Sequence, residues 1–260
     1  DGRLQADTII AMHKAVDLDI VFPMMDLTVE SEALGATVNW DIDELPAVTG
    51  IKVSTIEDAR NLIVPEVGEG NRLNIFVDTC SNLKKAFPNK PVWAYVLGPF
   101  SIAGRLMGMT EIAIAVKLEP EVVHATLEKC QELLTKFIKA LLETGVDGLM
   151  VLEPASGMLR ADDADAFSNN YIKDLVDLIK SYDKTPSLHN CGQIAHMIEN
   201  LCATGIEALH VGSVTDTLDA YNRIPENVVL MGNLDPTEVF LRGTPESIAE
   251  AVKKLADKMA

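Results

Sequence analysis

Short apolar runs alternate with amphipathic helical stretches along most of this 260-residue chain, and this alternation is what most constrains its fold. The runs predicted as strands cover residues 19–23, 92–97, 148–152, 186–189, 207–211 and 228–231. Helices are predicted over residues 73–83, from Pro120 to about Gly145, over 171–179, and from Pro245 with Thr244 as its N-cap. Parallel strands need crossover connections of this kind, so the pattern predicts an α/β fold with a parallel sheet, open or closed.

A closed (β/α)8 TIM barrel is the commonest arrangement of such units, and six strands are two fewer than it needs. The first segment is a helix without a preceding strand, and the last helix has no strand after it. We therefore expect a barrel that is incomplete at both ends of the chain, within a longer native polypeptide. Residues 36–70 interrupt the alternation and are rich in Asp, Glu, Pro and Gly. We expect one domain over residues 1–260, with an irregular insertion or a short hairpin at 36–70.

Composition limits the classes of partner. The formal net charge of −17 argues against nucleic acid and anionic membrane surfaces. No stretch approaches the roughly 18 consecutive apolar residues of a membrane helix. The four cysteines show no spacing typical of a disulfide framework, which favours a reducing compartment. We expect a cytoplasmic protein that binds neither nucleic acid nor membrane.

The pair His189 and Cys191 is the strongest chemical signal in the sequence. Residues two apart on a strand point to the same face, so an imidazole and a thiol can converge on one ion. Both are ligands that zinc takes. Gly192 then allows the chain to turn into a helical stretch, at a strand end where α/β enzymes carry their chemistry. The alternative is a buried histidine and a small buried thiol with structural roles only.

Further polar residues follow the other predicted strands. These residues are Asp26, Glu153, Asn233 and Asp235. The segment Gly98-Pro99-Phe100-Ser101 also ends a strand and opens a helix, so it offers free backbone N–H groups. In a barrel all of them would surround one mouth together with the His189 and Cys191 pair. Taken alone, each residue is more commonly a loop residue, a helix cap or a solvated carboxylate, and it is their shared location that favours a site.

Four segments resemble the uroporphyrinogen decarboxylase superfamily, in matching order and spacing. They are DLTVESEALG at residues 26–35, GPFSIAG at 98–104, HNCG at 189–192 and GNLDPT at 232–237. The resemblance implies a (β/α)8 barrel. Within the superfamily, the decarboxylases lack the H-x-C-G segment at this strand, whereas cobamide-dependent methyltransferases, including methylcobamide:coenzyme M methyltransferases, use it to bind zinc.

The resemblance implies zinc-dependent transfer of a methyl group from a methylated corrinoid, such as methylcobalamin, to a thiol like coenzyme M or to a folate. A separate corrinoid-binding protein is the expected donor partner. His189 and Cys191 would bind the zinc. The third ligand in such methyltransferases is a cysteine on the last barrel strand, which we expect beyond residue 260, and His210 is a weaker candidate.

The remaining candidate residues come from their positions after the predicted strands and from the resemblance to the superfamily. Asp26 matches the catalytic aspartate of the decarboxylases, and we take Asp26 and Glu153 as candidate catalytic residues. The candidate substrate-binding residues are Gly98, Phe100, Ser101 and Asn233. Two alternatives stay open: a decarboxylase of the uroporphyrinogen type that uses Asp26 without metal, and a non-catalytic protein that binds a corrinoid or tetrapyrrole.

Overall fold

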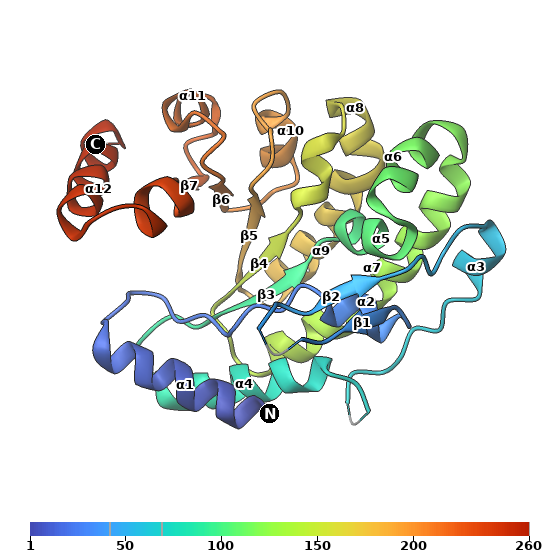
Figure 1. Cartoon of the computed structure of the whole chain (residues 1–260), viewed down its shortest axis with the longest axis horizontal. Coiled ribbons are helices and arrows are strands. Elements are labelled where there is room, and N and C mark those ends of the chain that lie inside the picture. The colour runs from blue at the N-terminus through green and yellow to red at the C-terminus, as the bar shows by residue number, and fades with distance from the viewer. Residues whose placement is uncertain (42, 69, 260) are drawn as a thin grey trace.

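A five-stranded parallel sheet forms the centre of the protein in a computed structural model, which describes residues 1–41, 43–68 and 70–259. Each strand pairs with the next one along the chain, and Figure 1 shows them side by side from green to red-brown. The strands are β3 (Trp93–Leu97), β4 (Gly148–Leu152), β5 (Thr185–Asn190), β6 (Ala208–Val211) and β7 (Val229–Met231). Sequential parallel pairing with a helix after each strand is the arrangement of a (β/α)8 barrel. The predicted fold class is confirmed.

The register of the sheet aligns one row of residues at the carboxyl ends of the strands. Leu97 pairs with Leu152, and Leu152 pairs with His189. His189 pairs in turn with His210, and His210 with Met231. The loops that follow these five positions therefore open at one edge of the sheet, where barrel enzymes place their active sites.

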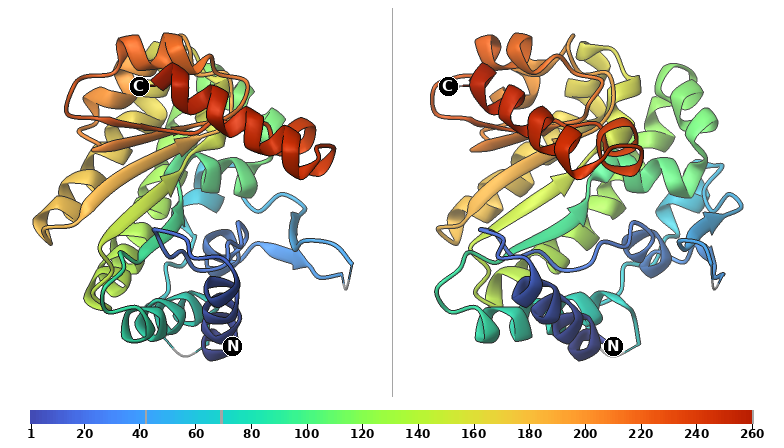
Figure 2. Two further views of the ribbon diagram at one scale, coloured as in Figure 1. Left: turned by 90° about the vertical axis from the view of Figure 1, so that its left-hand side faces the viewer. Right: turned by 60° about the vertical axis from the view of Figure 1, so that its left-hand side comes forward.

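The helices that connect the strands cover the outer face of the sheet (Figure 2). The long helix α7 (Pro120–Glu143) buries Leu127, Leu134 and Phe137, as its periodicity predicts, and Gly145 follows with a φ of 86°. The other helices before β5 are α1 (Gly2–Ala15), α2 (Val29–Ala33), α3 (Ile56–Arg60), α4 (Leu73–Ala86), α5 (Pro99–Met107), α6 (Met109–Leu118), η1 (Pro154–Met158), α8 (Ala161–Ala164), η2 (Asp165–Asn169) and α9 (Asn170–Ser181). After β5 come α10 (Ile198–Ala203), α11 (Thr217–Arg223), η3 (Pro236–Leu241) and α12 (Pro245–Met259).

Residues 19–23 were predicted as a strand, and this prediction is wrong. In the structure they contribute only one parallel bridge, between Val21 and Val92. The Val21 N–H donates to Pro91 O at 2.9 Å, and Trp93 N–H donates to Val21 O at 2.9 Å. Pro23 has no N–H to donate to the next position of the ladder, which explains why the pairing stops there.

The insertion at 36–70 contains one of the two forms expected for it. Strands β1 (Thr37–Asn39) and β2 (Ala47–Thr49) form a short antiparallel hairpin, followed by α3. The first strand of this hairpin is followed directly by Trp40, whose side chain is exposed. Two of the three residues in each strand are exposed as well, so the hairpin, which follows the end of α2, projects from the core.

Among the described helices, none is by itself long and apolar enough to cross a membrane. Helices α5 and α6 pass that test only as a pair, and they meet at an angle of 105°.

Candidate active site

Asp26 lies in the loop that leads from the Val21 bridge to α2, and its carboxylate is held by a network of donors. Its Oδ1 accepts from the Thr28 N–H at 2.9 Å and from the Thr28 hydroxyl at 2.7 Å. Its Oδ2 forms an ion pair with the guanidinium of Arg72. Arg72 also pairs with Glu32 and lies over the ring of Trp40, with 4.4 Å from its Cζ to the ring centroid. Asp26 is thus a fixed, charge-paired acceptor at the mouth.

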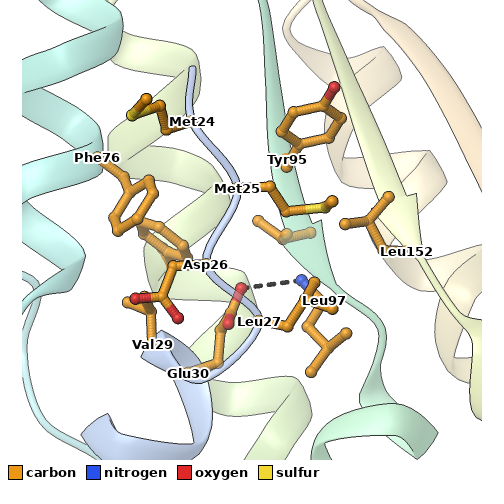
Figure 3. A pocket seen from close by; sticks show the side chains of 12 residues that line it. Met24, Met25, Asp26, Leu27, Val29, Glu30, Phe76, Tyr95, Leu97 and Leu152 are labelled. Atoms are coloured by element: carbon orange, nitrogen blue, oxygen red, sulfur yellow. Dashed lines mark hydrogen bonds between the residues drawn. The ribbon is translucent and has the colours of Figure 1, made fainter. Parts of the chain in front are cut away.

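Glu30 is the second carboxyl group beside Asp26, and the sequence analysis did not select it. It lies on α2 and is only 3% exposed. Its Oε1 accepts from the Leu97 N–H at 2.8 Å (Figure 3), whereas Oε2 has no hydrogen-bond partner among the described residues. Burial raises the pKa of Glu30 to about 7, and the charge of Asp26 adds to this effect.

Asp26 and Glu30 line a small pocket whose other side chains are apolar except for the hydroxyl of Tyr95 (Figure 3). The walls come from the loop before α2, from α4, from β3 and β4, and from α7. The other lining residues are Met24, Met25, Leu27, Val29, Phe76, Tyr95, Val96, Leu97, Phe137 and Leu152. Carboxyl groups with apolar neighbours interact strongly with a ligand, because little water is present to screen their charge or dipole.

Glu153, a predicted catalytic residue, lies directly after β4 and is fully buried. Its two carboxylate oxygens accept from the N–H groups of Phe100 at 3.0 Å and Ser101 at 2.7 Å, and from the Ser101 hydroxyl. The Gly98 N–H donates to Leu152 O at 2.6 Å. The N–H groups that we expected to be free for a substrate are therefore engaged within the protein. In the structure Glu153 accepts hydrogen bonds from the N–H groups at the N-terminus of α5, which have no partner within the helix. The catalytic role of Glu153 and the substrate-binding roles of Gly98, Phe100 and Ser101 stay predictions.

Asn233 lies after β7, and its amide joins two loops of the mouth. Its Nδ2 donates to Gly212 O at 2.7 Å and to Thr215 O at 2.6 Å, while its Oδ1 accepts from the Thr217 hydroxyl. The neighbouring Asp235 caps η3 through the N–H groups of Thr237 and Glu238. Both side chains organise the loops around the mouth, and the predicted contact of Asn233 with substrate stays a prediction.

His189 and Cys191 take different positions at the end of β5. His189 is half-buried on the strand, with its ring centroid 4.7 Å from that of His210 on β6. Cys191 is exposed, one residue past the strand. Asn190 holds this turn, because its Oδ1 accepts from the Gly192 N–H at 2.8 Å and its Nδ2 donates to Glu153 O at 2.6 Å.

The donor types at this strand end fit a zinc ion. The Nδ1 atom of His189 is buried, and within the described part of the chain no hydrogen bond uses it, as expected of a nitrogen that awaits a metal. Burial lowers the pKa of His189 to about 4, so the ring is neutral, and neutral imidazole is the form that binds metal. Among the described residues, no three His, Cys, Asp or Glu side chains are yet grouped as a complete metal site. His189 and Cys191 would supply two ligands, and a further ligand is needed.

Two residues of the mouth were missed from sequence, Glu30 and Arg72. Glu30 carried a weak signal, because it interrupts the apolar positions Val29, Ala33 and Leu34 of a short helix. No sequence pattern indicated Arg72, because it is 46 positions away from its partner Asp26 in the chain.

The fold and the mouth define an α/β-barrel protein with a candidate site at the carboxyl ends of its strands. The protein-family model described as "Uroporphyrinogen decarboxylase (URO-D)" matches residues 1–260, and the chain belongs to this family. It is 28% identical over 261 residues to the methylcobamide:CoM methyltransferase MtbA of Methanosarcina acetivorans, covering 99% of this chain and 76% of that protein. It is 31% identical over 255 residues to the uroporphyrinogen decarboxylase of Pelodictyon phaeoclathratiforme, covering 92% and 69% of the two chains.

A solved structure described as a methyltransferase from Methanosarcina mazei has the same fold. It superimposes with a TM-score of 0.89 at 20% sequence identity, covering 99% of this chain and 77% of that one. The predicted resemblance to the superfamily is thereby confirmed, as is the barrel.

Proposed function

We propose that this protein transfers a methyl group from a methylated corrinoid to a thiol such as coenzyme M, with zinc bound by His189 and Cys191. The observation that carries the proposal is the buried, unpartnered Nδ1 of His189 in the described structure, at a strand end where Cys191 follows. Relatives that are named methylcobamide:CoM methyltransferases support the expected class of enzyme, a corrinoid-dependent methyltransferase. The bound zinc, the corrinoid as methyl donor and the thiol as acceptor belong to the proposal.

Each candidate residue has a proposed part in this function. When bound, zinc would lower the pKa of the acceptor thiol and so supply a thiolate at neutral pH. Asp26, held by Arg72 and Thr28, orients the acceptor or the metal-bound group. Glu153 fixes the start of α5 and with it Gly98, Phe100 and Ser101, while Asn233 fixes the loops after β6 and β7. A separate corrinoid-binding protein in the cytoplasm would present the donor.

An anaerobic assay of the full-length protein tests this proposal. With zinc bound, we expect demethylation of methylcobalamin, followed by its absorption spectrum, when coenzyme M is present. A chelator should slow the reaction by roughly 30-fold or more, because a free alkyl thiol is only a few per cent thiolate at pH 7. Added zinc should restore the rate.

Two parallel reactions decide between the acceptors and between the enzyme classes. Tetrahydrofolate in place of coenzyme M shows which acceptor is used. Release of carbon dioxide from uroporphyrinogen in the presence of the chelator, without demethylation of methylcobalamin, would instead establish a decarboxylase that uses Asp26 without metal.

A further inference from the structure

Glu30 has the features of a group that exchanges protons rather than one that only stabilises the fold. It is almost fully buried, yet one of its carboxyl oxygens has no partner among the described residues and belongs to the wall of the Asp26 pocket. A buried polar atom without a partner is energetically unfavourable, because it has lost its hydrogen bonds to water. Such an atom in a pocket wall calls for an explanation in terms of what the pocket binds.

We propose that Glu30 is the proton-exchanging residue of this mouth, and that it takes up the proton which the acceptor thiol loses as it binds, before the thiolate is methylated. The inference rests on the proposed function. In this reaction the S–H bond breaks and its proton passes to the Glu30 carboxylate. An S–C bond forms as the Co–C bond of the methylated corrinoid breaks, and cobalt keeps the electron pair of that bond. Glu30 then returns the proton to solvent.

The position of Glu30 in the sheet register is compatible with this role. Its Oε1 is bonded to the N–H of Leu97, which lies in the same row as His189, two strands away. Neighbouring strands are about 4.8 Å apart, so this separation is about 10 Å. Hydrogen-bonded water or the substrate itself bridges such a distance at an open mouth.

Asp26 is less suited to carry the proton, although it lies beside Glu30. The Asp26 carboxylate is ion-paired with Arg72 and also accepts two hydrogen bonds from Thr28, so both of its oxygens are engaged. Two carboxyl groups in one pocket with such different surroundings take different roles, one as a fixed charge and the other as the acid or base.

The charged groups that act on Glu30 come from two elements. Asp26 in the preceding loop disfavours its ionisation, and Arg105 on α5 favours it. Arg72, the residue directly before α4, contacts Asp26 and Glu32, and the pocket residue of α7 is the uncharged Phe137. Burial acts against the charged form, and the resulting pKa of about 7 suits a group that exchanges protons near neutral pH.

The variant Glu30→Gln tests the inference in the full-length, zinc-loaded protein. We expect the maximal rate of thiol methylation to fall about 100-fold, with little change in the KM for coenzyme M, because the amide still accepts from Leu97 but cannot take up a proton. The wild-type rate should rise with pH through about 7, and the variant should lack this rise. Calorimetry of coenzyme M binding in two buffers of different ionisation enthalpy should show up to one additional proton released to the buffer by the variant.

Three controls separate this role from a structural one. Glu250→Gln, at an exposed position on α12, should leave rate and pH profile unchanged. Glu30→Ala should recover activity on addition of formate, which a purely structural residue would not allow. A wild-type protein that methylates thiols, with Glu30→Gln equal to it in rate, pH profile and proton release, overturns the inference alone. A wild-type protein that methylates no thiol overturns the proposed function and this inference together.

Discussion

Replacing Cys191 by alanine in the full-length protein is expected to remove about one zinc ion per chain and to abolish most thiol methylation. The Cys191 side chain is exposed directly after β5, where it can reach a metal beside His189. The loss of activity should exceed the roughly 100-fold that removal of an outer partner of a metal ligand causes, because here a ligand itself is lost. Elemental analysis of the purified variant and the anaerobic methylcobalamin assay measure both effects.

Two further variants make this result specific. Cys202→Ala removes a buried thiol on α10 and should keep both zinc and activity. His210→Ala asks whether the neighbouring imidazole, 4.7 Å from His189 between ring centroids, is a ligand or only packs against it. If Cys191→Ala retained as much zinc as the wild-type protein, the assignment of the metal site would be wrong.

The fold was largely predictable because strands of a parallel sheet are buried on both faces and read as continuous apolar runs. All five residues of β4 are buried, and its predicted bounds are the observed ones. The run at residues 19–23 has the same apolar character but forms only one bridge. The apolar composition of a segment indicates that it prefers an extended conformation, but not whether a neighbouring strand is placed to form backbone hydrogen bonds with it.

The site was predictable in position and much less so in its contacts. The polar residues that follow the strands lie at one edge of the sheet, as expected where the carboxyl ends of parallel strands meet, and their part in a functional site stays a prediction. The partners of those residues come from distant segments. Glu153 bonds to Ser101, 52 positions earlier, and Glu30 bonds to Leu97, 67 positions later. A single sequence does not reveal such pairs, so it does not separate a carboxylate that caps a helix from one that meets a substrate.

Replacing Glu153 by alanine is expected to destabilise the protein by about 3–5 kcal/mol. The substitution leaves the N–H groups of Phe100 and Ser101 and the Ser101 hydroxyl without their acceptor in a buried place. It also leaves a cavity directly after β4, at a residue with no exposed surface. Urea unfolding followed by circular dichroism measures the loss. Glu153→Gln is the matched control, since its carbonyl oxygen still accepts at one of the two oxygen positions and its volume is nearly the same, so it should lose less.

The same pair of variants tests how Glu153 couples stability to pH. Burial raises the pKa of Glu153 to about 7, opposed in part by its bonds to Ser101 and Phe100, whereas an exposed glutamate titrates near 4.5. The folded protein therefore holds this proton at pH values where the unfolded chain has lost it. The contribution of Glu153 to the unfolding free energy is full below about pH 4.5 and is lost as the pH rises through about 7.

Glu30 contributes to the pH dependence in the same direction, so the two Glu153 forms are best compared in a protein that also carries Glu30→Gln. There, Glu153→Gln should flatten the fall in unfolding free energy between these two pH values. An unchanged slope would mean that the donors of α5 keep the buried carboxylate ionised throughout, and that Glu153 serves the helix as a fixed charge.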